Sequence, residues 1–539
     1  LGLTLYSYPK LESLPHYGDW QAKFENGALV YYEKYADGSY GFFGANISAL
    51  SDKAVKGDGY GMIYGTERKE NVTVTVGGKP HELKWDTAIP ITATDKDVTK
   101  TYYLLPLPKE LVQEVAEVPQ VDGKPSFYTK LTADGKEYFY NPHFASTAVT
   151  DGSKVPTQIS IRTARQLYAL SEYYDKYVKI LPDGADFQQG CDIDYGTYVW
   201  KDYGKGGTAV TEQKPIGRTE TAPFKHSYDG GEHIITGVSF ASETNDTAVG
   251  LFGFVTGTLE NIVVTTDQTL KKAPTSRLDG SIQRRTVYIG VLAGQNSGRI
   301  YNCAVSGYKL SCYAYSGSTC YIGGLVGYNE GTVSACGAAI PSISGNTTNA
   351  RGYYAGALAG VNAGGGYIRQ SYALGSIELR EIRGSAVISG FVGDNQGTIR
   401  NSYCATALSA VTGAEVNGFA SAHGSVSNCY YLSGGTYTFA GTVRLYDYKP
   451  GDSGALPKTH EGMRELGLSG FSEVTETKNH PNTEVAEGTE AAYPYVGSVS
   501  GLGGIVHYGD WPTPADMGTI GMVYWEKEEG GANSGYHFS

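Results

Sequence analysis

The sequence predicts an all-β protein built around a parallel β-helix (β-solenoid), with small β modules on either side. Three observations predict this class: a repeat of constant length, strand-like alternation outside the repeat, and a composition rich in turn residues. The 539 residues include 73 glycines and 44 tyrosines but only 4 methionines, and charged residues make up 18%. A chain of this length has room for about two to four domains.

The repeat lies between Ile289 and Asn401. Each copy has a short apolar strand, a Gly-x-Asn-x-Gly turn and a second short strand. The first glycines of the turns and their asparagines both recur every 33 residues: Gly294, Gly327, Gly360 and Gly393, with Asn296, Asn329, Asn362 and Asn395. A propeller blade needs four strands in about 40–45 residues, so two or three short strands around a Gly-Asn corner favour a β-helix coil.

The repeated asparagines are expected to form a structural ladder. Stacked coils lie about 4.8 Å apart, so side-chain amides in one position of successive coils can bond to each other. We expect the flanking glycines to supply the positive φ of a tight corner. In the alternative interpretation the asparagines face outward and bind sugar. The constant 33-residue spacing favours the ladder over this alternative.

The motif from Gly323 to Val333, Gly-Gly-Leu-Val-Gly-x-Asn-x-Gly-x-Val, resembles the GLUG repeat of bacterial surface proteins. That family includes extracellular segments of immunoglobulin-A-cleaving metallopeptidases and large adhesins. The resemblance covers about residues 245–432 and implies a right-handed parallel β-helix. The flanking segments look similar to large surface proteins of Gram-positive bacteria, many of which carry prepilin-type leaders. The chain opens with Leu1 and no basic leader region, so we expect its native start to lie upstream.

We divide the chain into four regions. Residues 1–150 form N-terminal β-rich, sandwich-like modules, and 151–245 a capping helix with irregular opening coils. Residues 246–432 form the GLUG-type solenoid, and 433–539 a C-terminal β module that resembles the N-terminus.

Local patterns predict the elements before the repeat. Residues 71–79 alternate and end in Gly-Gly, and residues 129–140 contain Asp-Gly, so both predict hairpins. Residues 35–42 predict a third hairpin, and 110–117 a short helix. Leu167, Leu170 and Tyr174 fall on one face at helical spacing. We expect that helix to cover the open edge of the first coil.

The two ends of the chain resemble each other. Residues 16–20 and 507–511 both read His-Tyr-Gly-Asp-Trp. Candidate partner-binding aromatics in the two copies are Tyr17, Trp20, Tyr31, Tyr32, Tyr508, Trp511, Tyr524 and Trp525. Aromatic rings can stack on sugars or on a partner surface, and the alternative is that they form the core of a small domain.

The sequence contains weak candidates for chemistry. His81-Glu82 begins like a zinc-peptidase motif, but Trp85 stands at the second histidine position. An acidic set comprises Asp192, Asp194, Asp229, Glu232 and His233. Its alternatives are turn residues, an acid and base for glycoside cleavage, or oxygen ligands for calcium, although the spacing matches no EF-hand loop. Turn residues are the favoured interpretation, so we expect no catalytic residue, metal or cofactor.

Seven cysteines are present without a C-x-x-C motif, which disfavours zinc and thioredoxin-like chemistry. Cys303 and Cys336 occupy the same position in neighbouring coils, where they could stack or bond. Cys312 and Cys320 flank a Ser/Gly-rich excursion that a disulfide could close. Stacked thiols and at least one disulfide both remain open.

Charge and hydropathy exclude two classes of partner. The net charge of −12 disfavours nucleic acid, which requires clustered Lys and Arg. No stretch approaches 18 consecutive apolar residues, so no membrane span is expected.

We therefore expect a non-enzymatic extracellular or cell-surface protein with a structural or adhesive role. Its solenoid stalk would associate end to end or bind a host glycan or protein. The alternatives are a carbohydrate-active β-helix enzyme and a glycan-binding adhesin that uses the terminal aromatics.

Overall fold

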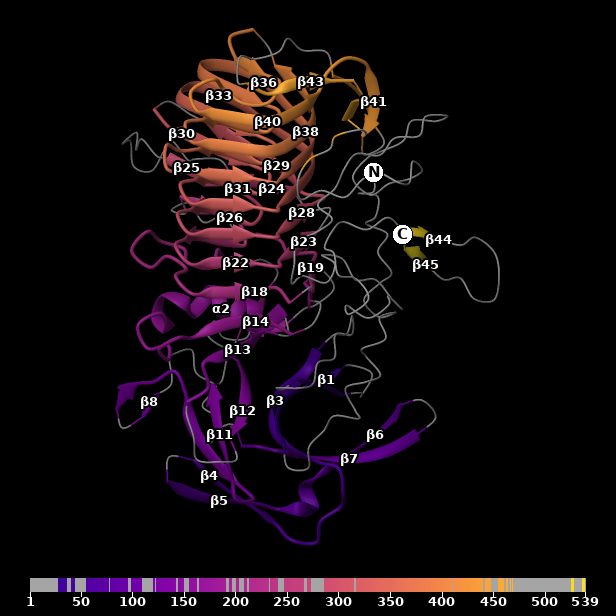
Figure 1. Ribbon diagram of the computed structural model, residues 1–539. Helices are drawn as coiled ribbons and strands as arrows, with labels where there is room; N and C mark the ends of the chain where they lie inside the picture. The colour runs from indigo at the N-terminus through magenta and orange to yellow at the C-terminus, as the bar shows by residue number, and fades with distance from the viewer. Residues whose placement is uncertain are drawn as a thin grey trace. The chain divides into compact units, whose positions relative to one another are not determined.

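The computed structural model describes most of residues 28–468, together with 525–527 and 536–538; its longest internal gaps are 44–54, 109–119, 273–285 and 447–453. The chain divides into two compact units, within residues 9–211 and within residues 212–539. Most described residues lie in β-strands (Figure 1). The expectation of a mostly β protein with a large parallel sheet is confirmed.

Two five-stranded antiparallel sheets dominate the described part of the first unit. One has the order β2 (Tyr40–Phe43), β1 (Ala28–Tyr35), β3 (Val55–Tyr64), β7 (Val98–Pro106) and β6 (Ile89–Asp95). The other has the order β12 (Phe144–Val149), β11 (Lys136–Asn141), β10 (Thr129–Ala133), β4 (Val72–Val76) and β5 (Lys79–Leu83). Their sandwich-like packing stays a prediction.

The three predicted hairpins are confirmed. β1 pairs with β2, β4 with β5, and β10 with β11, all antiparallel. Asp134 and Gly135 connect β10 to β11 with φ of 49° and 74°, the two positive values that a type I′ turn requires. The helix predicted at 110–117 lies outside the described residues.

The predicted amphipathic helix is present as α2 (Ala164–Tyr177). Leu167, Leu170 and Tyr174 are all fully buried, as their common face requires. α2 lies in sequence between β13 (Gln158–Ile161) and β14 (Asp186–Gln189), which pair in parallel. Its role as a cap stays a prediction.

Short strands complete the first unit: β8 (Gln120–Val121), β9 (Lys124–Pro125), β15 (Ile193–Asp194), β16 (Trp200–Asp202) and β17 (Thr208–Val210), with the 3-10 helix η4 at Trp85–Thr87.

The second unit contains stacked coils in which strands pair in parallel with their counterparts one coil away (Figure 1). One 33-residue coil contains five strands: β25 (Thr286–Ile289), β26 (Ala293–Asn296), β27 (Arg299–Tyr301), β28 (Ala304–Ser306) and β29 (Lys309–Ala314). The prediction of two or three strands per coil was therefore wrong. Glycine and asparagine corners break the coil into shorter segments than the apolar pattern indicates.

The remaining strands fall into the same columns. The four asparagine-bearing strands, β26, β31 (Val326–Asn329), β34 (Ala359–Asn362) and β37 (Val392–Asn395), form a five-stranded sheet with β21 (Phe252–Val255), in which Val255 pairs with Asn296. The other columns contain β18 (Ser227–Asp229), β19 (Ile234–Thr236), β20 (Ala248–Val249), β22 (Thr258–Glu260), β23 (Val263–Thr265), β24 (Thr269–Lys272), β30 (Thr319–Gly323), β32 (Thr332–Ser334), β33 (Gly337–Gly356), β35 (Tyr367–Arg369), β36 (Tyr372–Ser389), β38 (Thr398–Ala410), β39 (Glu415–Asn417), β40 (Ser425–Leu432) and β43 (Leu456–Lys458).

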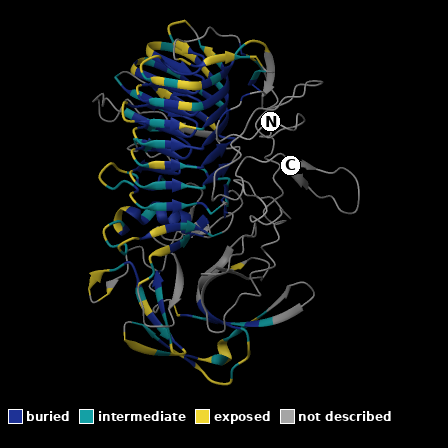
Figure 2. Ribbon diagram, viewed as in Figure 1, coloured by how far each residue is buried: buried dark blue, intermediate teal, exposed yellow. Residues whose placement is uncertain are grey.

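Apolar side chains repeat in register through the interior of the stack. Ile300 pairs with Val333, and the column continues through Ile368 and Ile399, all fully buried (Figure 2). Each such side chain contributes about 1.5–3 kcal/mol on burial. The hydrophobic effect therefore holds every coil to its neighbours.

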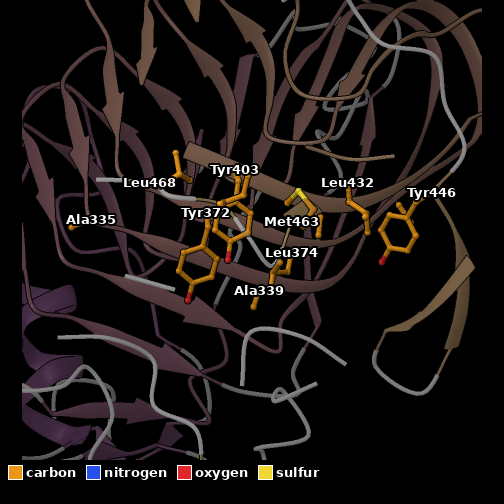
Figure 3. Close-up of a cluster of buried hydrophobic side chains, with 12 residues drawn as sticks. Ala335, Ala339, Tyr372, Leu374, Tyr403, Leu432, Tyr446, Met463 and Leu468 are labelled. Atoms are coloured by element: carbon orange, nitrogen blue, oxygen red, sulfur yellow. The ribbon is translucent and has the colours of Figure 1, made fainter. Parts of the chain in front are cut away.

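A second apolar cluster covers one outer flank of the last coils. Successive strand residues point to opposite faces, so Tyr372 and Leu374 project away from the face to which Ala373 points. Met463, Leu466 and Leu468 belong to the same cluster of buried side chains (Figure 3). The chain after the last coil therefore packs along the side of the stack.

Two hairpins follow the stack in sequence: β41 (Thr436–Phe439) with β42 (Thr442–Leu445), and β44 (Trp525–Lys527) with β45 (Tyr536–Phe538). β43 pairs in parallel with β40, so parallel pairing extends beyond residue 432. No helix among the described residues has the length and apolar character needed to cross a membrane.

Candidate functional site

The four repeated asparagines lie in one column. The Nδ2 atoms of Asn296, Asn329 and Asn362 each donate to Oδ1 of the next asparagine along the stack, over 2.8 Å in every case. All four side chains are fully buried. The same Nδ2 atoms also reach backbone carbonyls at 3.1–3.4 Å. Both protons of each donating amide are thus used inside the stack.

The glycines that lie two residues before the ladder asparagines have a different role from the one predicted. Gly294, Gly327, Gly360 and Gly393 are absent from the residues with positive φ. A Cβ at Gly327 would lie 2.6 Å from the Ile289 nitrogen and 2.7 Å from the Gly294 oxygen. Close approach of neighbouring coils, rather than backbone conformation, requires glycine at this position.

The positive φ occurs instead at the corner after the second strand of the turn motif. There φ lies between 48° and 57° at Asn261, Asn302, Ala335, Gln370, Asn401 and Asn428. Two pairs in this column are bonded: Asn302 Nδ2 to Asn261 Oδ1 at 3.3 Å, and Asn428 Nδ2 to Asn401 Oδ1 at 2.8 Å. The sequence reading missed this partial ladder, although asparagine's tolerance of the left-handed region was a usable signal.

A column of small polar side chains follows that corner: Cys303, Cys336, Ser371, Ser402 and Cys429. Each sulfur or oxygen bonds the carbonyl two residues earlier, at 2.8–3.3 Å. In the middle of the column each also accepts from the backbone N–H of the preceding coil, as Cys336 Sγ does from Cys303 at 3.5 Å. Thiol and hydroxyl therefore satisfy the same backbone groups.

The described cysteines separate into two kinds. Cys303, Cys336, Cys404 and Cys429 are free and buried, while Cys312 and Cys320 form a disulfide. Burial raises the pKa of the Cys303 and Cys404 thiols, and that of Cys429 to about 12. Protonated, inaccessible thiols are inert, so these cysteines act as packing groups.

The asparagine ladder ends at an Asp–His pair. His423 follows Asn395 in the column, but its Nδ1 lies 2.8 Å from Oδ1 of the outward-facing Asp394. Ser421 Oγ donates to the same Oδ1 at 2.9 Å, and Gln396 Nε2 donates to Oδ2 at 2.7 Å. Asn395 Nδ2 is buried without an acceptor among the described residues, because the imidazole has turned outward.

Each member of the pair favours the charged form of the other. Burial raises the pKa of Asp394, but hydrogen bonds from His423, Gln396 and Ser421 outweigh burial and lower it. The hydrogen bond to Asp394 and its charge raise the pKa of His423. The carboxylate is buried, whereas two-thirds of the imidazole surface is exposed.

Beside this pair lies a cluster that we call the tyrosine patch: Tyr288, Tyr321, Tyr328 and Tyr354. The Tyr321 ring stacks on Tyr288 and Tyr354, with centroids 5.5 and 5.3 Å apart. Tyr328 meets Tyr288 and Tyr321 at steeper angles, 5.6 and 5.2 Å away. All four are partly exposed. The sequence reading missed the patch, although three of the tyrosines share the 33-residue step.

The hydroxyls of the patch stay protonated at neutral pH. Burial, with neighbouring carboxylates and tyrosines, raises the pKa of Tyr288 and of Tyr321 to about 12. Burial and the charge of Asp394 raise the pKa of Tyr354. These phenols can donate and accept hydrogen bonds.

Of the acidic set named from the sequence, only Asp229 and His233 lie among the fully described residues. Asp229 Oδ1 accepts from the Gly231 N–H at 2.9 Å and from Asn261 Nδ2 at 2.8 Å, which is the geometry of a turn residue. The side chain of Asp194 and the residues Asp192 and Glu232 lie outside the described residues, and His233 precedes β19. No group of three metal-ligating side chains occurs among the residues that the structure describes.

The His81-Glu82 pair lies on a strand rather than a helix. His81 pairs with Val74 and Glu82 with Thr73 in the β4–β5 hairpin. Alternating strand residues point to opposite faces, so the pair cannot present the helical surface that a zinc-peptidase motif requires.

Most terminal aromatics fall beyond the described residues, namely Tyr17, Trp20, Tyr508, Trp511 and Tyr524. Tyr31 and Tyr32 lie on β1, paired with Phe43 and Phe42, and Trp525 lies on β44, paired with Phe538. Their role as partner contacts stays a prediction.

Comparison with known proteins gives structural likenesses alone. No protein-family model and no curated protein matches the chain. A crystal structure described as a "putative immunoglobulin A1 protease" from Bacteroides ovatus is 19% identical with a TM-score of 0.40, over 57% of this chain and 86% of that one. A structure named "IgA1 Protease" is 13% identical with a TM-score of 0.30, over 80% of this chain and 28% of that one.

These names contradict one expectation from the sequence. We expected a protein that is not an enzyme, and both similar structures bear the name of a protease. The exclusion of enzymes is therefore withdrawn. The names belong to those proteins and assign no reaction to this chain.

Proposed function

We propose that residues 246–432 form a right-handed β-solenoid stalk of GLUG type in an extracellular or cell-surface protein with a structural or adhesive role. The observation that supports this role most directly is the column of four bonded asparagines. A buried amide row ties each coil to the next independently of the apolar core. A spacer that resists bending and tension needs both the hydrogen-bonded amide row and the apolar core.

The distribution of interactions also supports a spacer. Corner asparagines, the Cys/Ser column and inward-facing isoleucines and valines all repeat from coil to coil. In such a stack each coil depends mainly on its neighbours, and stability sums along the axis.

Single-molecule pulling on the full chain, held by its two ends, tests the stalk. A stack that bears tension should yield coil by coil, and each 33-residue coil should release about 110–120 Å of contour length. Asn362→Leu should lower the force of the steps from neighbouring coils, while Tyr313→Ala, an exposed side chain outside the ladder, should leave it unchanged. Smooth extension without regular steps would rule out the stalk.

End-to-end self-association is the second part of the proposal. Sedimentation velocity across a wide concentration range, with negative-stain images of the most concentrated sample, tests it. Filaments of linearly joined particles are expected. Monomers at every concentration would remove self-association and leave a host surface as the partner.

A further inference from the structure

The tyrosine patch faces outward and plays no part in the buried core. On each of its strands the next residue points inward: Ile289 after Tyr288, and Ile322 after Tyr321, both fully buried. The three stacked tyrosines pair directly across neighbouring strands. The patch therefore presents ring edges and hydroxyls at the spacing of the coils, about 4.8 Å.

Polar side chains border the rings. Tyr328 shares its column with Gln295, whose Oε1 is buried without a partner among the described residues, and with Asp394. Glu330 accepts from Ser297 Oγ at 3.0 Å and from Gln295 Nε2 at 3.3 Å. The exposed imidazole of His423 completes the row at the Asp394 end.

We infer that the tyrosine patch, together with the exposed imidazole of His423, binds a neutral oligosaccharide lying along the stack axis. Sugar hydroxyls both donate and accept, and they find phenol hydroxyls and an imidazole that Asp394 holds in place here. Apolar C–H groups of the sugar pack against the exposed ring surfaces of the patch. The coil spacing is close to the length of one sugar residue in an extended chain, so successive residues meet equivalent contacts.

The charges beside the patch select against other polymers. Glu220, Glu330, Asp394 and Glu415 influence its tyrosines, and the positive groups beside them are Arg351 and, when protonated, His423. This excess of carboxylates repels uronic acid chains and sulfated glycans. A cationic peptide would match the charge and is therefore the competing ligand in the test.

The inference rests on the extracellular location in the proposed function, and its test is separate from the pulling experiment. Titration calorimetry of the full chain should use neutral hexasaccharides of glucose, mannose, galactose and N-acetylglucosamine. Hexagalacturonate and hexalysine provide the anionic and cationic arms. Binding of at least one neutral hexasaccharide is expected, with none of hexagalacturonate.

Variants locate the site. Tyr321→Ala, at the centre of the patch, should weaken binding about tenfold or more. Tyr321→Phe keeps the ring and the fold and should weaken it by a smaller factor, and so should Asp394→Asn. Tyr313→Ala, on an exposed tyrosine elsewhere in the stack, is the matched control and should change nothing. Binding of hexalysine alone, no binding across the neutral panel, or unchanged affinity in both Tyr321 variants would overturn the inference.

Discussion

Replacement of Asn329 by leucine tests the asparagine ladder at its centre. Asn329 accepts from Asn296 Nδ2 at 2.8 Å and donates to Asn362 Oδ1 at 2.8 Å and to the Gly331 carbonyl at 3.1 Å. Leucine has the same number and branching of side-chain heavy atoms, and the control below carries the same increase in side-chain volume. The substitution removes the hydrogen-bond partner of the Asn296 and Asn362 side-chain amides.

The magnitude follows from the atoms left behind. Each buried polar atom without a partner costs about 1–3 kcal/mol. Asn362 Oδ1 loses its donor, whereas Asn296 Nδ2 keeps a weaker bond to the Thr332 carbonyl at 3.4 Å. We therefore expect a loss of about 2–4 kcal/mol in the local free energy of opening.

The assay is hydrogen exchange with mass spectrometry, because local opening energies can be assigned to peptides even when unfolding is not two-state. Asn395→Leu is the matched control. Asn395 Nδ2 already lacks an acceptor, and Asn362 Nδ2 keeps the Gly366 carbonyl at 3.3 Å, so the loss should be about 1 kcal/mol. Equal losses for the two variants, or none for Asn329→Leu, would refute the reasoning.

Three further predictions concern other columns. Cys336→Ser should leave the melting temperature within about 2 °C of the parent, because serine fills the same position at Ser371 and Ser402; Cys336→Val should be clearly destabilised, since it leaves the Cys303 N–H without an acceptor. Gly327→Ala should disrupt the stack and lower the melting temperature more than Gly364→Ala, because a Cβ at Gly364 meets nothing within 4 Å; equal shifts would contradict the close-approach argument. The contribution of the Asp394–His423 pair should be fully present between pH 3.8 and 6.5, the ordinary values of the two groups. It should fade as pH rises through the raised pKa of His423, or falls through the lowered pKa of Asp394. Opening free energies near residue 423, obtained after correction for intrinsic exchange, that are flat across pH 5–8 would contradict it, and so would an unaltered profile in Asp394→Asn.

The sequence predicted those features that arise when the same residue type recurs at a fixed interval. Asn296, Asn329 and Asn362 recur every 33 residues, so their alignment follows once coils stack. Hairpin turns such as Asp134-Gly135 were equally readable, because their chemistry is local.

Other features depend on contacts that no local pattern encodes. The left-handed corner is occupied by Asn302, Ala335 and Gln370 in successive coils. Because the residue type differs from coil to coil, the sequence does not reveal that the backbone conformation is the same. The sequence places His423 next in the asparagine column and shows a shorter last coil, but it does not encode the contact of His423 with Asp394. The 33-residue spacing of Tyr288, Tyr321 and Tyr354 could have predicted the tyrosine column, but the sequence could not predict that these rings are partly exposed.

The direction of the amide row has an electrical consequence. All three hydrogen bonds run from the nitrogen of one asparagine to the oxygen of the next, so their dipoles add and polarise one another. The positive end of this row of dipoles lies at Asn395, in the coil that also contains Asp394. It favours negative charge on that coil, much as the first turn of an α-helix does.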